Sequence, residues 1–430
     1  MVNKAQTEKH NFYIAAYKLH MRLNKYLKVV VIILAVFYAF KCACNGHDFE
    51  VFVDAGSKII HGLNIYKPPF AQNLNYYYSP LFALLLSPFS YLPIIVPQFL
   101  WILFSYFLMY RIWILSAAYF NYSDFSIKQQ RLWLFITFIL ALRFLLLDVG
   151  FVQMTTFLLW ATLQSMSLFK QKKYVLGGAL LSLAINIKLL PLAFVVYLAY
   201  RNQWKPALLT IFFFVVYLFV PALYLGWEGN NSLLHDWFAT LNPSNKEWLV
   251  EAENGPSSLV ALIPVYITDT TGVLAFKRNF VNLNFGQVSL IVNVVRLVFV
   301  LFTLVFLRTL PFKTINSNLR RYWEMSYLFI VIPLIYPHQQ QYAFVFITPV
   351  FIYLSYYFIA NWDAVKKNMN AFLWALLIIV GINFTPLISS GIITHYVFDL
   401  LLYLRILPMA AIMLIVLLWI CRPKAELITE

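Results

Sequence analysis

The chain has 430 residues, of which 62% are hydrophobic and 11% are charged. A water-soluble domain of this length cannot bury so much apolar surface, so the composition excludes a soluble globular protein. The net charge of +15 does not indicate a nucleic-acid-binding protein, because the basic residues lie in short stretches between apolar runs and form no binding face.

The N-terminal region contains a basic tail and then the first apolar run. Residues 1–28 are predicted to be cytoplasmic by the positive-inside rule, and residues of about 29–44 form the first membrane helix, not a cleaved signal peptide. This helix is followed by an external loop, residues 45–94, which contains short interfacial helices. Because Asp48 follows the helix directly, it is held near the membrane surface and is a candidate general base.

Two regions do not fit a simple count of membrane helices. For the basic loop 119–131 to be cytoplasmic, residues 80–118 must cross the membrane once. Residues 80–92 are therefore interpreted as an interfacial or half-inserted helix and about 95–118 as the second membrane helix. The segment 174–200 has basic residues on both sides, so both of its ends are expected in the cytoplasm and the segment must enter the membrane and come back. It is predicted to form two short helices that meet near Lys188 and Pro191 in a recessed, outward-facing cavity.

With these two interpretations, about 12 crossings place every basic cluster in the cytoplasm. The fold class predicted is an all-α polytopic membrane protein with a single transmembrane domain over 29–422. A long external loop spans 227–286, and residues 423–430 form a cytoplasmic tail.

Four cations lie within apolar runs, in the outer halves of the predicted helices: Arg143, Lys188, Arg296 and Arg405. A charge at that depth costs roughly 2.5–3.5 kcal/mol, so an anion is expected nearby. A lipid-linked phosphate has its charge at this depth. The alternative for each arginine is a buried aspartate partner or a side chain that reaches back to the interface.

Polar residues for a sugar are concentrated in two outer segments. If a helix begins within "YPHQQQYAFVFITP" (336–349), then His338, Gln341 and Tyr342 share one face of it; the alternative is an interfacial cap. "ENGPSSLVAL" (253–262) offers Asn254 and Ser258. The three cysteines support neither a disulfide framework nor a zinc site, and no metal-binding or phosphate-loop motif is present.

Several short motifs occur in a fixed order over about residues 45–350. These are "DFEVF" (48–52), "HGLNIY" (61–66), "YYSPLFALLLSPFSYLP" (77–93), Gln153, "INIKLLP" (185–191), the Asn-to-Ser-Leu segment 254–259, and "YPHQQQYAFVFITP". In this order they resemble glycosyltransferase family 87, membrane enzymes of the GT-C class that use polyprenyl-phosphate sugars. The chain departs from the family pattern at Ser79 and at Val152, where a proline and a glycine are usual.

The resemblance implies a GT-C fold and inverting transfer of a sugar, with mannose as the leading candidate, from a polyprenyl-phosphate donor. It implies no cofactor or required metal. The acceptor is a hydroxyl of a lipid, glycan or protein of the cell envelope, and the active site of this multi-pass protein is expected to face outward from a bacterial plasma membrane.

The resemblance and the residue pattern together assign roles. Asp48 is the predicted catalytic base. The predicted donor-phosphate residues are Lys188, His338, Arg143, Arg296 and Arg405. The predicted sugar or acceptor residues are Gln153, Gln341, Tyr342, Asn254, Ser258 and Asp54. Whether His338 or Gln341 takes the role of the family histidine stays open. The alternative functions are a flippase or transporter of a lipid-linked sugar and a glycan polymerase or ligase.

Overall fold

The computed structural model describes residues 25–45, 48–242, 255–270, 272–389 and 391–423, and within these ranges the chain forms helices and no β-strand. The helices of the first half are α2 (Lys25–Ala43), α3 (Asp48–Ile60), η1 (Ala71–Asn73), α4 (Pro80–Leu86), η2 (Ser87–Tyr91), α5 (Ile95–Ala117), α6 (Ile127–Gly150), α7 (Thr155–Lys170), α8 (Tyr174–Ile187), η3 (Leu190–Leu192), α9 (Ala193–Tyr200) and α10 (Trp204–Phe219).

The second half begins with a sharply kinked helix and ends with another broken pair. Its helices are α11 (Ala222–Thr240), α13 (Leu259–Leu262), α14 (Pro264–Ile267), α15 (Phe285–Leu307), α16 (Asn318–Ile335), η4 (Gln341–Ile347), α17 (Thr348–Ala360), α18 (Trp362–Lys367), α19 (Ala371–Phe384), α20 (His395–Tyr403) and α21 (Ile406–Ile420).

Four helices in the described part of the chain are long and apolar enough to cross a membrane, and the number rises to seven if each of three bent helix pairs is one span. Shorter apolar helices accompany them, at Pro80–Tyr91, Tyr174–Ile187, Leu190–Tyr200 and Ala371–Phe384. The protein is therefore an all-helical membrane protein. The crossing number of about 12 stays a prediction.

The helix breaks predicted in the two regions are present, whereas the interfacial position of the first and the outward-facing cavity of the second stay predictions. Residues 80–91 form a short helix, α4 and η2, before the long helix α5. The segment 174–200 is broken at Lys188, whose backbone is extended at φ −148° and ψ 131°. After the break, Pro191 lies in the first turn of η3, a position where a missing N–H costs nothing.

The core of the molecule is built on α16 and α17. Every residue from Tyr322 to Leu334 is buried, because α16 packs against η4, α17 and α21. By contrast, α15 exposes a row of large apolar side chains, namely Leu290, Val294, Leu297, Val298, Leu301 and Leu304. An apolar helix face exposed on this scale matches contact with lipid.

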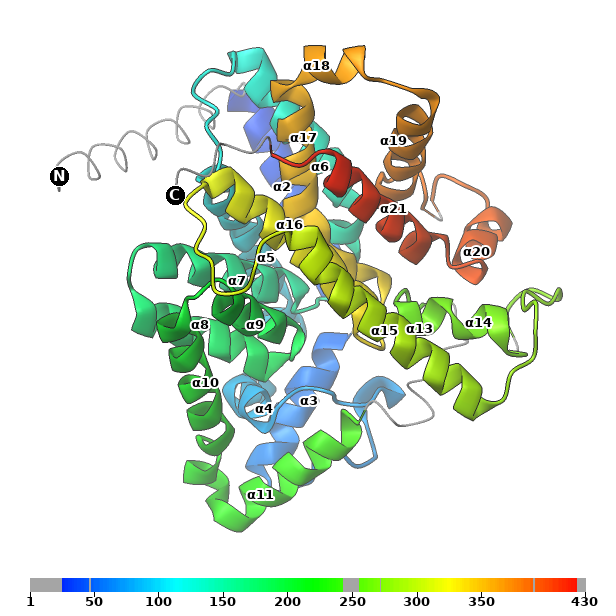
Figure 1. Ribbon diagram of the computed structural model, residues 1–430. Coiled ribbons are helices and arrows are strands. Elements are labelled where there is room, and N and C mark those ends of the chain that lie inside the picture. Colours follow the sequence, from blue (N-terminus) through cyan, green and yellow to red (C-terminus); the bar gives the residue numbers. More distant parts are fainter. Residues whose placement is uncertain (1–24, 46–47, 243–254, 271, 390, 424–430) are drawn as a thin grey trace.

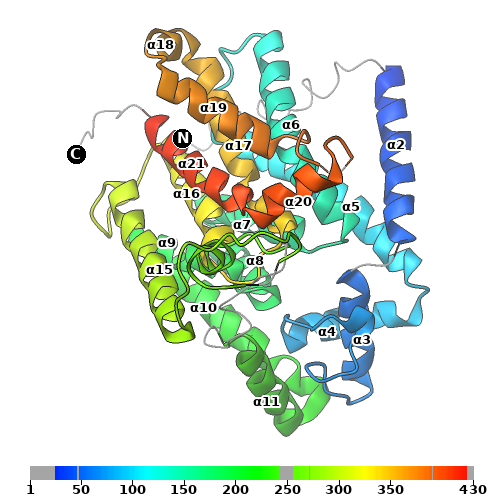
Figure 2. The ribbon, with the colours of Figure 1, turned by 90° about the vertical axis from the view of Figure 1, so that its right-hand side faces the viewer.

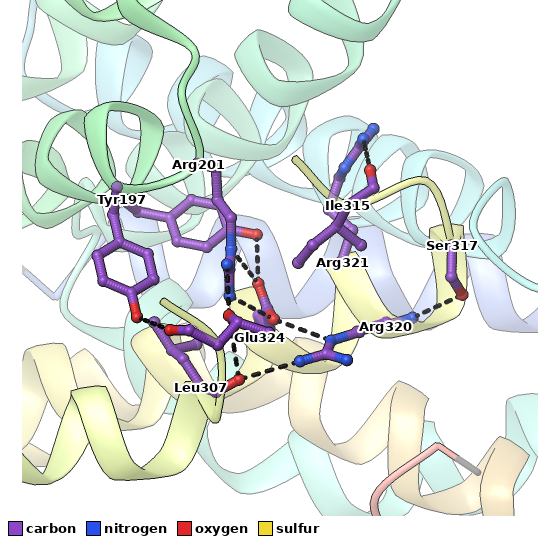
Figure 3. Close-up of polar contacts among 10 residues, drawn as sticks. Tyr197, Arg201, Leu307, Ile315, Ser317, Arg320, Arg321 and Glu324 are labelled. Carbon is purple, nitrogen blue, oxygen red and sulfur yellow. Dashed lines mark hydrogen bonds and ion pairs between the residues drawn. The ribbon is translucent and has the colours of Figure 1, made fainter. Parts of the chain in front are cut away.

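A buried ion cluster ties three helix ends together (Figure 3). The carboxylate of Glu324, at the start of α16, accepts hydrogen bonds from Arg201 Nε at 2.9 Å, Arg201 Nη2 at 2.7 Å and Tyr197 Oη at 3.0 Å. The more exposed Arg320 adds a longer contact from its Nε, at 3.3 Å. Arg201 also donates to Thr309 Oγ1 at 2.6 Å, so the cluster joins α9, α16 and the end of α15.

The short helices α3, α4 and α11 gather at one end of the molecule, and α18 with its lysines lies at the opposite end in both views (Figures 1 and 2). The helices α3 and α4 approach closely at Gly56. A Cβ there would lie 2.9 Å from the backbone N of Ser87 and 3.0 Å from the carbonyl O of Ala83. This contact fixes the position of α3, and with it the position of Asp48 at its first residue.

Candidate active site

A chain of polar contacts connects Asp48 with Lys188. The Gln153 side-chain amide donates a hydrogen bond to the Asp48 carboxylate, and the Tyr78 hydroxyl donates to Gln153 Oε1 at 3.3 Å. The Lys188 ammonium lies 6.0 Å from the centre of the Tyr78 ring, within the range of a cation–π contact. Four segments that are distant in the sequence therefore meet at one place.

Local backbone features hold these side chains. Ser79 caps α4 by accepting a hydrogen bond from the Phe82 N–H at 3.3 Å, which fixes Tyr78 just before the helix. Gln153 follows a tight turn at Val152, where φ is 50°. A left-handed backbone is unfavourable for a β-branched residue, and this explains why glycine suits the position better. Lys188 stands at the break between α8 and η3.

The charges at this site act on one another. Asp48 and Asp148 both lie close enough to Lys188 for their charges to interact with its ammonium, and Tyr342 is near the same two carboxylates. Among the described residues, no hydrogen bond or ion pair holds the Lys188 ammonium. Burial, reinforced by the nearby Tyr342 and Asp48, raises the pKa of the Tyr78 hydroxyl well above its ordinary value. Tyr78 therefore stays protonated and acts as a donor.

The segment 336–342 differs from the expected helical arrangement. The helix η4 begins only at Gln341, and His338, with φ 53°, lies in the preceding loop, so the prediction of one shared helix face was wrong. The ring of His338 lies 5.3 Å from that of Tyr77. The Tyr342 hydroxyl lies near Asp48, whereas Gln341 accepts a hydrogen bond from Arg143 Nη2 at 2.7 Å.

Arg143 and Arg405 bind oxygens of the protein itself. Besides Gln341, Arg143 donates to the Asn383 carbonyl at 3.2 Å. Arg405 donates to the Pro256 carbonyl at 2.8 Å, and Pro256 forms a bridge with Gln340. These two arginines therefore brace the segment that carries Tyr342. Their predicted contact with the donor phosphate stays a prediction.

Three other predicted residues, Arg296, Ser258 and Asp54, make contacts with their own helices. Arg296 projects from α15 and donates to Asn293 of the same helix at 3.4 Å. Ser258 is buried and caps α13 by accepting from the Ala261 N–H at 3.3 Å. Asp54 pairs with Lys58 of its own helix at 2.8 Å. Asn254 lies outside the described residues.

The structure adds two residues that sequence reasoning did not assign to the site, Tyr78 and Asp148. Tyr78 is one of three consecutive tyrosines, and the sequence gives no reason to prefer it over its neighbours. Asp148 did carry a signal, because an aspartate within an apolar run is by itself a candidate functional residue. Among the described residues, no group of three or more His, Cys, Asp and Glu side chains could hold a metal ion.

The fold and this site define a membrane protein in which a carboxylate, a nearby ammonium and hydrogen-bonding side chains converge outside the long helices. Residues 76–268 match the model of glycosyltransferase family 87, which confirms the resemblance seen in the motifs and indicates a membrane glycosyltransferase. The matched range contains Tyr78, Gln153 and Lys188, whereas Asp48 and Tyr342 lie outside it. No curated protein matches the chain.

Proposed function

We propose that the protein transfers a sugar, with mannose as the leading candidate, from a polyprenyl-phosphate donor to a hydroxyl of an envelope lipid, glycan or protein. The reaction inverts the anomeric carbon and takes place on the outer side of a bacterial plasma membrane. The observation that supports this proposal is the connection of Asp48 through Gln153 and Tyr78 to Lys188. The transfer as proposed needs a base and a cation in one site, and this connection supports Asp48 and Lys188 in those roles.

In the proposed reaction, Asp48 accepts the proton of the acceptor hydroxyl while the acceptor oxygen attacks C1 of the sugar. The bond between C1 and the phosphate oxygen breaks, and its electron pair stays on the polyprenyl phosphate. The amide of Gln153 orients the Asp48 carboxylate by donating to it. Lys188 offsets the charge that develops on the phosphate, since lysine binds phosphate as a point charge.

Each role has an expected magnitude. A positioned general base contributes about 10²- to 10⁴-fold to the rate. A cation placed where charge develops, in a site from which water is excluded, contributes about 10²- to 10³-fold. Tyr342 lies near Asp48, and the His338 ring lies 5.3 Å from that of Tyr77, tilted by 60°. These side chains are suited to hold the sugar, because a sugar needs both hydrogen-bonding groups and aromatic faces.

The test is transfer of labelled sugar from polyprenyl-phosphate [¹⁴C]mannose in membranes of a strain that produces the protein. The variant Asp48→Asn keeps the size of the side chain and still accepts from Gln153, so we expect a folded protein whose transfer falls by about 10²- to 10⁴-fold. Asp269→Asn is the matched control, because Asp269 pairs with the exposed Lys277 at 2.6 Å and has no assigned role in transfer. It should retain transfer.

Full transfer by the Asp48→Asn variant would remove the assigned base. Label that crosses the membrane but remains on the polyprenyl phosphate would indicate a flippase instead of a transferase. The same experiment with other polyprenyl-phosphate sugars tests the choice of mannose.

A further inference from the structure

A pair of exposed aromatic rings joins the start of α10 to the loop that follows α15. Trp204, the first residue of α10, stacks on Phe312 of this loop, with ring centres 5.7 Å apart and ring planes that differ by 24°. Trp204 is 47% exposed and Phe312 is 56% exposed, and Leu310 of the same loop is 69% exposed. Apolar side chains that gather on a surface mark a site of contact with a membrane or a partner.

The loop is fixed to the turn that precedes α10. The Phe312 N–H donates to the Tyr200 carbonyl at 2.7 Å, and Arg201 Nη1 donates to Thr309 Oγ1 at 2.6 Å. The backbone of Phe312 is left-handed, with φ 64°, a conformation that is unfavourable for residues other than glycine. The structure therefore holds the Phe312 ring in one place on the surface, although burial of the ring in the core does not explain its position.

The aromatic pair lies level with the ends of apolar helices. The lipid-facing helix α15 ends at Leu307, so the loop begins where a helix of membrane-spanning length ends. The helices α8 and α10 begin at Tyr174 and Trp204, and one turn later they are in close contact, since a Cβ on Gly178 would lie 3.1 Å from the Cβ of Leu209. Aromatic residues at such helix ends belong in the headgroup region of a bilayer.

The segments around the pair are basic. Residues 170–176, 200–206 and 308–318 contain seven Lys and Arg residues and no Asp or Glu. Six of the seven are exposed, namely Lys170, Lys172, Lys173, Lys205, Arg308 and Lys313. A basic surface beside the ends of membrane helices attracts anionic lipid headgroups.

We propose that Trp204, Phe312 and the lysine that follows each of them form a binding site for an anionic phospholipid. Lys205 and Lys313 bind the headgroup phosphate, and the two rings contact the glycerol backbone and the upper part of the acyl chains. The lipid belongs to the leaflet on the side of the basic loops, which the charge pattern predicts to be cytoplasmic. Charge complementarity favours this occupant over a zwitterionic lipid, because the surrounding segments contain cations and no carboxylate side chain.

The test is quenching of tryptophan fluorescence in the purified full chain, in an uncharged detergent, by phospholipids with brominated acyl chains. Subtraction of the signal of the Trp204→Tyr variant isolates Trp204. We expect brominated phosphatidylglycerol to quench Trp204 at a lower concentration than brominated phosphatidylcholine does. Lys205→Gln/Lys313→Gln should raise the half-quenching concentration of phosphatidylglycerol about 25-fold, or about five-fold for each charge removed near a lipid surface, and should leave that of phosphatidylcholine unchanged.

The matched control is Lys366→Gln/Lys367→Gln, which removes the same charge from α18, a helix that lies apart from α10 in both views (Figures 1 and 2). It should leave the quenching of Trp204 unchanged. Because all four lysines are exposed, neither double variant should change the melting temperature without added lipid.

Equal quenching of Trp204 by the two lipids would overturn the inference, and so would an unchanged affinity for phosphatidylglycerol in Lys205→Gln/Lys313→Gln. Absence of quenching by either lipid would also overturn it, since the rings would then lie away from the bilayer, as a surface for a soluble protein partner does.

Discussion

The ion cluster at Glu324 allows a prediction of stability whose size follows from burial. Glu324 is fully buried, and Arg201, which is 1% exposed, gives it two of its hydrogen bonds, at 2.9 and 2.7 Å. Replacement of Arg201 by Met leaves a buried carboxylate with poorer compensation. We expect this change to lower the free energy of unfolding by about 3–5 kcal/mol, the usual cost of breaking a buried ion pair from one side.

Arg320 provides the matched comparison. Its side chain is 27% exposed, and its Nε contacts the same carboxylate at 3.3 Å. A partly exposed pair of this kind contributes about 0–1 kcal/mol, so Arg320→Met should cost much less than Arg201→Met. The variant Arg201→Met/Glu324→Leu removes both charges, and we expect it to recover most of the loss, because an apolar pair of similar volume replaces a buried ion pair at little cost.

The measurement is unfolding of the purified protein in mild detergent, followed by tryptophan fluorescence during a titration with a denaturing detergent. The interaction energy of Arg201 and Glu324 is obtained from the single and double variants. Equal destabilisation by Arg201→Met and Arg320→Met would refute the reasoning from burial. The reasoning would also be refuted if the loss of stability in Arg201→Met/Glu324→Leu equalled the sum of the losses in Arg201→Met and Glu324→Leu measured singly.

Two further predictions concern the position of Asp48. Gly56→Ala places a Cβ 2.9 Å from the backbone nitrogen of Ser87. It should lower the free energy of unfolding by about 1–3 kcal/mol and reduce transfer. The control is Gly381→Ala, whose Cβ meets open space, and it should melt at the same or a higher temperature. Gln153→Leu removes the donor to Asp48 and should lower kcat about 10- to 100-fold. Tyr78→Phe, which removes only a donor to Gln153, should have a smaller effect in the same transfer assay.

Much of the fold could be predicted from charge and hydropathy, because the membrane restricts the choices. The break at Lys188 followed from basic residues on both sides of a single apolar segment, and the short helix at 80–91 followed from the same count. The proximity of Asp48 and Lys188 was likewise expected, because the charge pattern predicts both residues on the outer side of the membrane. These inferences depend on local composition, which a single sequence contains.

Long-range partners could not be predicted in this way. The oxygens that bind Arg143 and Arg405 include the backbone carbonyls of Asn383 and Pro256, and every residue has such a carbonyl. Glu324 lies among the basic residues of "LRRYWEMSY", and nothing local points from it to Arg201. The η4 helix begins three residues later than His338 because the loop before it pairs with another segment, through the Ser257 N–H and the Gln339 carbonyl at 2.7 Å.

That pairing between Ser257 and Gln339 also sets the order in which the enzyme can mature. Asp48, Gln153 and Lys188 are all made within the first half of translation, but Ser257 has no partner in this pairing until the ribosome has passed residue 339. A nascent chain therefore contains Asp48 and Lys188 before Tyr342, which lies near Asp48, has been made. The site is therefore complete only after the segment that contains Gln339 and Tyr342 has been synthesised.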